Sequence, residues 1–224
     1  MHTTSSKDSP TSTSPGGSFD ITLADANGIP VAPVFHACET EAILNMTVEM
    51  INRLIQHNDR IPLTSASLTR FHSRAPPTIS ITDYLRRIVK YAAIEKSVLL
   101  LLLIYVDRIC EIHRTFTISS LTAHRFIISA VVAGCKSLSD IYCTNTHFAK
   151  VGGISCQELN VLELEFCKLI GWRLSCSMDT LQQYYISLVR TSSRYIYPNV
   201  TTPVVLYPEE NARESQLGTG QDVD

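Results

Sequence analysis

The feature that most constrains this chain is a run of nine apolar residues from Val98 to Val106. Lys96 and Asp107 flank the run, and the helical pattern around it extends from Glu95 to His113. A helix that is apolar on all sides must be covered on all sides, whereas a helix that spans a membrane needs about 20 residues. The run therefore predicts the central, buried helix of a packed domain and argues against a membrane anchor.

Four further helical patterns surround this one in the sequence, and together they predict an all-α domain. Gly152-Gly153 and Gly171 end two of the patterns, and Ser155 with Glu158 has the spacing of a capping box. No strand-like alternation competes between residues 78 and 195. Five helices, four of them around one apolar helix, are the plan of a compact helical domain. The four patterns are Thr82–Ala93, Ile118–Tyr142, Asn145–Val151 and Ser155–Ile170.

The flanks of this region are predicted to differ from it. Residues 37–60 carry apolar residues at helical spacing and predict one amphipathic helix, and a last helix at Met178–Arg194 completes the domain of residues 78–195. The expected disordered tails are residues 1–36, rich in Ser, Thr and Pro at their start, and residues 196–224. Ser9-Pro10 and Ser14-Pro15 fit proline-directed kinases and fit a plain solvated tail equally well.

Composition argues against several classes of function. The net charge is -2, and no basic stripe of the kind found in nucleic-acid-binding proteins is present. The seven cysteines include no CxxC pair, which favours reduced thiols in an intracellular protein of the nucleus, the cytoplasm or both. Cys135, Cys143, His147 and Cys156 match no familiar zinc spacing. We therefore expect no metal, no cofactor, no nucleic acid and no membrane partner.

The sequence also lacks a catalytic constellation. Gly152-Gly153 is not followed by the Lys-Ser/Thr of a phosphate-binding loop. No G-x-S-x-G motif occurs, and His113, His124 and His147 are scattered along the chain without the spacing of a metal site. The chain is therefore not expected to be an enzyme.

Three charged residues lie on or beside apolar helix faces, where an unpaired charge is costly. Asp107 falls in line with apolar residues of the central helix, so it should pair with a cation, and Arg87 is the expected partner. Lys136 shares a stripe with Asp140 that can be a solvated face. Glu163 lies at the edge of an apolar face, so it is either neutralised locally or completed by a donor from another protein.

Several blocks of sequence, in order along the chain, resemble one known family. They resemble the cyclins of the yeast phosphate-signalling group and the plant P/U-type and protozoan cyclins, over about residues 78–190. The resemblance implies a single five-helix cyclin box, with one helix before it and one after it, in agreement with the helices predicted from periodicity. The blocks are Ile104–Arg108, Ser119–Leu121, Thr122–Phe126, Ala133–Lys136, Asn145–Ile154 and Glu158–Glu163.

The resemblance implies a partner and the residues that bind it. Cyclins bind a cyclin-dependent protein kinase and set the position of its regulatory helix, with a Lys late in the third helix of the box and a Glu in the fifth. These look like Lys136 and Glu163. Asp140 is expected to meet an arginine of the kinase. The apolar contacts expected from their helix faces are Leu138, Leu164 and Cys167, and the buried Arg–Asp pair of cyclin boxes looks like Arg87 with Asp107.

The biological role stays open at this point. The first interpretation is a regulatory subunit that activates the kinase in cell-cycle control. The alternative is the same kinase-binding activity in phosphate or nutrient signalling. A second alternative is a cyclin-fold interaction module of the transcription type, which would bind DNA and should show a basic surface.

Overall fold

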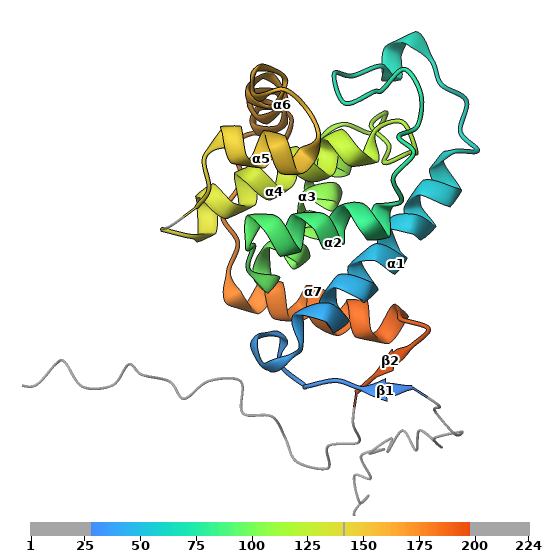
Figure 1. Ribbon diagram of the computed structural model, residues 1–224. Helices are drawn as coiled ribbons and strands as arrows, with labels where there is room; N and C mark the ends of the chain where they lie inside the picture. The colour runs from blue at the N-terminus through green and yellow to red at the C-terminus, as the bar shows by residue number, and fades with distance from the viewer. Residues whose placement is uncertain (1–27, 141, 198–224) are drawn as a thin grey trace, which may run out of the picture.

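The computed structural model describes residues 28–140 and 142–197, which form a helical bundle with one pair of two-residue strands (Figure 1). None of the helices within these ranges is both long and apolar enough to cross a membrane. The α-helices are α1 (Thr40–Asn58), α2 (Ile81–Ala92), α3 (Lys96–Ile112), α4 (Ala123–Leu138), α5 (Asn145–Gly152), α6 (Cys156–Leu169) and α7 (Met178–Thr191). The short elements are the strands β1 (Ile29–Pro30) and β2 (Tyr195–Ile196) and the 3-10 helices η1 (Phe35–Ala37) and η2 (Ser65–Ser67).

Helix α3 lies at the centre of the fold, as the apolar run predicts. All its residues from Ser97 to Val106 are buried, and it packs against α1, α4 and α7. The rings of Tyr105 and Phe126 each pack edge-on against Phe166 of α6, at centroid distances of 5.4 and 5.5 Å. Such edge-on contacts are favoured between aromatic rings. They fix α6 against α3 and α4.

The predicted five-helix box is confirmed as α2 to α6, with α1 before it and α7 after it. The largest difference concerns α4, which is shorter than the predicted 118–142. A turn precedes it, in which Thr122 Oγ1 donates to Thr117 O at 2.9 Å and accepts from Ser119 N at 2.8 Å. The backbone of Ser139 is extended, with ψ 132°, so α4 ends shortly after Lys136.

Local capping residues fix the ends of α5 and α6. Thr144 Oγ1 accepts from the backbone of the third residue of α5, and Gly153 ends that helix with φ 72°, a conformation that glycine adopts without steric cost. Ser155 Oγ accepts from Glu158 N at 3.0 Å, as the predicted capping box requires. The Glu158 carboxylate pairs instead with Arg125 of α4. The side chain that would have closed the box thus holds α6 against α4.

The boundaries of both predicted tails need correction, because residues 28–36, 196 and 197 belong to the fold. β1 and β2 pair in parallel, with Ile29 opposite Tyr195. Gln182 of α7 holds the segment that follows β1: its side chain accepts from Phe35 N at 3.0 Å and donates to Pro33 O at 2.8 Å. The remaining tail predictions, with Ser9-Pro10 and Ser14-Pro15, lie outside the described residues.

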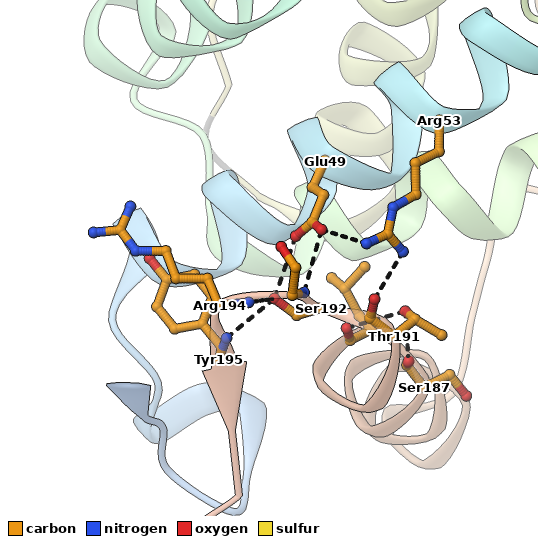
Figure 2. Close-up of polar contacts among 9 residues, drawn as sticks. Glu49, Arg53, Ser187, Thr191, Ser192, Arg194 and Tyr195 are labelled. Carbon is orange, nitrogen blue, oxygen red and sulfur yellow. Dashed lines mark hydrogen bonds and ion pairs between the residues drawn. The ribbon is translucent and has the colours of Figure 1, made fainter. Parts of the chain in front are cut away.

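A polar network joins α1 to the turn after α7 (Figure 2). Glu49 of α1 forms an ion pair with Arg53 and accepts from Ser193 N at 3.2 Å and from Ser192 Oγ at 3.3 Å. Arg53 also donates to Thr191 O at 2.7 Å. The network places the start of β2 next to α1.

Candidate partner-binding site

The side chains of Lys136 and Glu163 meet between the end of α4 and the middle of α6. Lys136 Nζ lies 2.7 Å from Glu163 Oε1, and the two side chains are 31% and 16% exposed. Sequence analysis named the two residues as contacts for a partner, and the structure brings them together. Because the pair is partly solvated, the ammonium has protons and the carboxylate has lone pairs that another protein can use.

Asn145, the first residue of α5, binds the second oxygen of Glu163. Its Nδ2 donates to Glu163 Oε2 and to Asn160 Oδ1, at 2.7 Å each. The Glu163 carboxylate is therefore held from two sides, by a cation and by a neutral amide. In the sequence Asn145 stands out only as part of the motif Asn145–Ile154, because its contact with Glu163 depends on how α5 packs against α6.

The three apolar residues predicted beside the pair differ in exposure. Leu164 is 48% exposed, one residue after Glu163 on α6, and Leu138 is half-buried. Cys167 is buried, so it forms the floor beneath the pair and not the surface beside it. Burial and the nearby Glu163 carboxylate raise the pKa of the Cys167 thiol, and Lys136 opposes them in part. Leu164 is therefore the predicted apolar residue most available to a partner.

Asp140 lies in the connection between α4 and α5, just beyond the end of α4. Its side chain is exposed, and it forms no ion pair with any residue in the described ranges. An exposed carboxylate four residues after Lys136 can accept hydrogen bonds from an arginine of another protein, and the contact with a kinase arginine stays a prediction.

The sequence matches the family model described as Cyclin over residues 4–174, a segment that contains the whole Lys136–Glu163–Asn145 arrangement. The chain belongs to the cyclin family. This confirms the resemblance and the fold predicted from it.

Named relatives of this cyclin come from fungi and plants. The "Nuc-1 negative regulatory protein preg" of Neurospora crassa is 41% identical over 72% of this chain and 34% of its own length. The "PHO85 cyclin PHO80" of Saccharomyces cerevisiae is 34% identical, over 77% of this chain and 64% of its own. "Cyclin-U4-1" of Arabidopsis thaliana is 31% identical, over 75% and 87%. This chain thus spans about a third of the Neurospora relative and just under two thirds of the yeast one.

The cyclin does not form the predicted buried pair between Arg87 and Asp107. Asp107 is exposed near the end of α3 and accepts from the hydroxyl of Tyr184 at 2.7 Å. Arg87 lies elsewhere, with its guanidinium 5.2 Å from the ring centre of Tyr84 and close to Gly153 at the end of α5. The prediction failed because helical spacing shows which face of the helix a residue occupies, but it does not show how far along the helix that face is buried by neighbouring elements.

The connection from α6 to α7 holds an exposed aromatic residue that was not predicted from the sequence. Trp172 is 64% exposed and has φ 59°, a left-handed conformation that is rare for residues other than glycine. The backbone there is well anchored: Trp172 N donates to Cys167 O at 2.9 Å, and Tyr105 Oη donates to Leu174 O at 2.8 Å. A large apolar side chain is thus held in solvent by a strained backbone, close to the floor of the Lys136–Glu163 pair. The only sequence signal was the Gly171 before it.

A polar hollow of about 490 Å³ lies between the first halves of α4 and α6 and the loop before α2. Arg125 forms its wall, since it donates to the carbonyl groups of Arg70 and His72 and pairs with Glu158. No group of three His, Cys, Asp or Glu side chains suited to a metal ion occurs there or elsewhere in the described part of the chain.

Proposed function

We propose that this cyclin binds and activates a cyclin-dependent protein kinase of the PHO85 kind, with the Lys136–Glu163 pair at the centre of the interface. The observation that carries the proposal is the pair itself, two opposite charges 2.7 Å apart on an open face beside the exposed Leu164. The Saccharomyces cerevisiae relative is named as a PHO85 cyclin, which supports this choice of partner.

The proposed mechanism is allosteric. A protein kinase is active only when its own Lys–Glu pair is formed, and that depends on the position of its regulatory helix. A cyclin that contacts this helix better in the active position shifts the equilibrium by the difference between the two binding free energies. Lys136 and Glu163 supply the polar contacts, Leu164 and Trp172 supply apolar ones, and Asp140 meets an arginine of the kinase.

We infer a role in phosphate or nutrient signalling in preference to cell-cycle control. Cell-cycle control was the first interpretation of the sequence, and nutrient signalling was the alternative. The name of the yeast relative refers to PHO85, and none of the relatives described above is named for the cell cycle. The comparisons therefore favour the alternative.

The first prediction concerns the ion pair. Lys136→Ala and Glu163→Ala are each expected to weaken binding to purified PHO85 kinase of Saccharomyces cerevisiae by about tenfold or more, because the remaining charge is left unpaired in the interface. Binding is measured by titration calorimetry, and activation by phosphorylation of a peptide.

The matched controls are Arg86→Ala and Glu41→Ala, which remove an exposed ion pair between α2 and α1 with an N–O distance of 3.1 Å. An exposed pair contributes little to stability or binding, so these variants should bind within about twofold of wild type. Wild-type affinity and activation in both pair variants would overturn the assigned interface.

A further inference from the structure

We propose that Asn145 is a positioning residue, which fixes the Glu163 carboxylate so that the ion pair has its binding geometry before a partner arrives. The inference rests on the proposed function, since it deals with the same face. It adds a residue for which neither the resemblance nor the relatives suggest a role.

The Asn145 amide binds one oxygen of the Glu163 carboxylate while Lys136 binds the other. The two hydrogens of Asn145 Nδ2 point to two acceptors, Glu163 Oε2 and Asn160 Oδ1, each 2.7 Å away. Lys136 takes the other oxygen of the carboxylate, also at 2.7 Å. With both oxygens engaged, the carboxylate cannot turn without breaking a hydrogen bond.

Asn145 is itself held in place by the packing of α5. It begins α5, whose first turn is capped by Thr144, and the ring of His147 makes a 2.7 Å hydrogen bond with Tyr91 O of α2. Phe148 and Ala149 anchor the helix in the core. Because the Asn side chain is short and α5 is held in place, the amide fixes the position of the Glu163 carboxylate relative to α5.

The Asn145 amide is a neutral donor, so its contact with Glu163 differs chemically from a second ion pair. A second cation at this place would neutralise the carboxylate, whereas the amide donates a hydrogen bond and leaves the negative charge available. Lys136 has a long side chain that would lose rotamer freedom on binding, and prior ordering reduces that loss. A neutral donor that fixes the carboxylate therefore favours a tight interface.

The test compares Asn145→Ala and the isosteric Asn145→Asp in the full chain, with PHO85 kinase as the probe. Asn145→Ala is expected to weaken binding about five- to tenfold, through the loss of prior ordering. Asn145→Asp places a second carboxylate against Glu163, so it should bind more weakly still at pH 7.5. Its binding should recover towards pH 5.5, because a protonated Asp is again a donor and no longer repels Glu163.

The matched controls are Asn45→Ala and Asn45→Asp on α1. Asn45 Nδ2 donates to the hydroxyl of Tyr195 at 3.1 Å, so these variants also lose an amide hydrogen bond between two elements, but away from the pair. They should bind the kinase within about twofold of wild type, with the pH dependence of wild type. A recovery at low pH that also occurs in Asn45→Asp would overturn the proposal.

A second measurement needs no kinase. In the free protein, the ¹⁵N signal of the Lys136 ammonium should be observable in wild type and lost or broadened in Asn145→Ala, because the Glu163 carboxylate that binds the ammonium is no longer fixed through its second oxygen. An unchanged signal together with wild-type affinity in folded Asn145→Ala and Asn145→Asp would overturn the proposal. A changed signal, with no kinase binding even in wild type, would support the positioning role and contradict the proposed function.

Discussion

Glu49 shows how a single carboxylate can join distant parts of this chain. Burial alone would raise the pKa of Glu49, but hydrogen bonds from Ser193 and Ser192 and the charge of Arg53 outweigh it and hold the pKa below the usual 4.5. A group with a lowered pKa in the folded state stabilises the fold above its unfolded pKa, and that contribution is lost as the pH falls through the folded pKa.

Glu49→Gln should therefore lower the free energy of unfolding at pH 7 by less than about 1 kcal/mol, since the group is partly solvated. The difference from wild type should shrink below about pH 4.5, where the Glu49 carboxylate becomes protonated in the unfolded chain and then in the folded one. Urea unfolding at pH 7 and at pH 3.5 measures this. Glu41→Gln, which removes a more exposed carboxylate, is the control, and an identical pH dependence in the two variants would contradict the prediction.

Individual residues differ in how far the sequence could predict them. Lys136 and Glu163 could be named as a site because a motif fixes their places on two helices. Asn145 could not, since its contact with Glu163 exists only after α5 has packed against α6. Asp107 was assigned to Arg87 on spacing alone, whereas α3 exposes Asp107 and turns it towards Tyr184.

At the scale of elements, the connection from α6 to α7 contains Trp172, which with Ala93 is one of two residues other than glycine with a positive φ in the described ranges. Gly171 and Trp172 follow one another with φ 60° and 59°. The left-handed conformation costs a residue with a side chain about 1–2 kcal/mol. The left-handed conformation of Trp172 therefore lowers the stability of the fold, while its indole is exposed to solvent.

Trp172→Gly and Trp172→Ala separate the contribution of the indole to kinase binding from the effect of the left-handed backbone on stability. Both should weaken kinase binding, because both remove the indole. The Gly variant should be more stable than the Ala variant by about 1 kcal/mol, since only Gly relieves the backbone. Thermal unfolding and calorimetric titration measure the two quantities, and unchanged affinity in both variants would remove Trp172 from the interface.

Helices were more predictable than their connections, for a physical reason. The ends of α5 and α6 follow from Thr144, Gly153 and Ser155, whose capping contacts are local in sequence. The start of α4 was placed too early, because the turn before it is built from side-chain hydrogen bonds that leave no periodic signal. β1 and β2 are two residues each and pair across most of the chain, so no alternation predicts them.

At the scale of the whole molecule, the segment from Val31 to Cys38 packs against α7 and α3. It joins the N-terminal part of the described chain to the C-terminal part. Gln182 satisfies two of its backbone groups, and Lys96 Nζ of α3 donates to His36 O and Cys38 O, at 2.9 and 2.7 Å. These contacts join residues about 60 to 150 positions apart. They stabilise the fold away from the Lys136–Glu163 pair.

Gln182→Ala should lower the free energy of unfolding by about 1–3 kcal/mol, because Phe35 N and Pro33 O are left without partners. Amide exchange of residues 31–38 should become faster, while kinase affinity stays unchanged. Gln183→Ala, an exposed neighbour on the same helix, is the control. Equal exchange rates in these two variants would contradict the role given to Gln182.

The pairing of β1 with β2 also has a practical consequence for anyone who handles this molecule. Gly28 and Tyr197, the first and last described residues, flank that pairing, and in Figure 1 the strands lie at the opposite end of the fold from α6. A fluorophore, a solid support or a second protein attached at either of them lies at the end of the fold away from α6 and from the proposed kinase-binding surface. Both ends are thus suitable points of attachment, and a linker between them would need to bridge only a short gap.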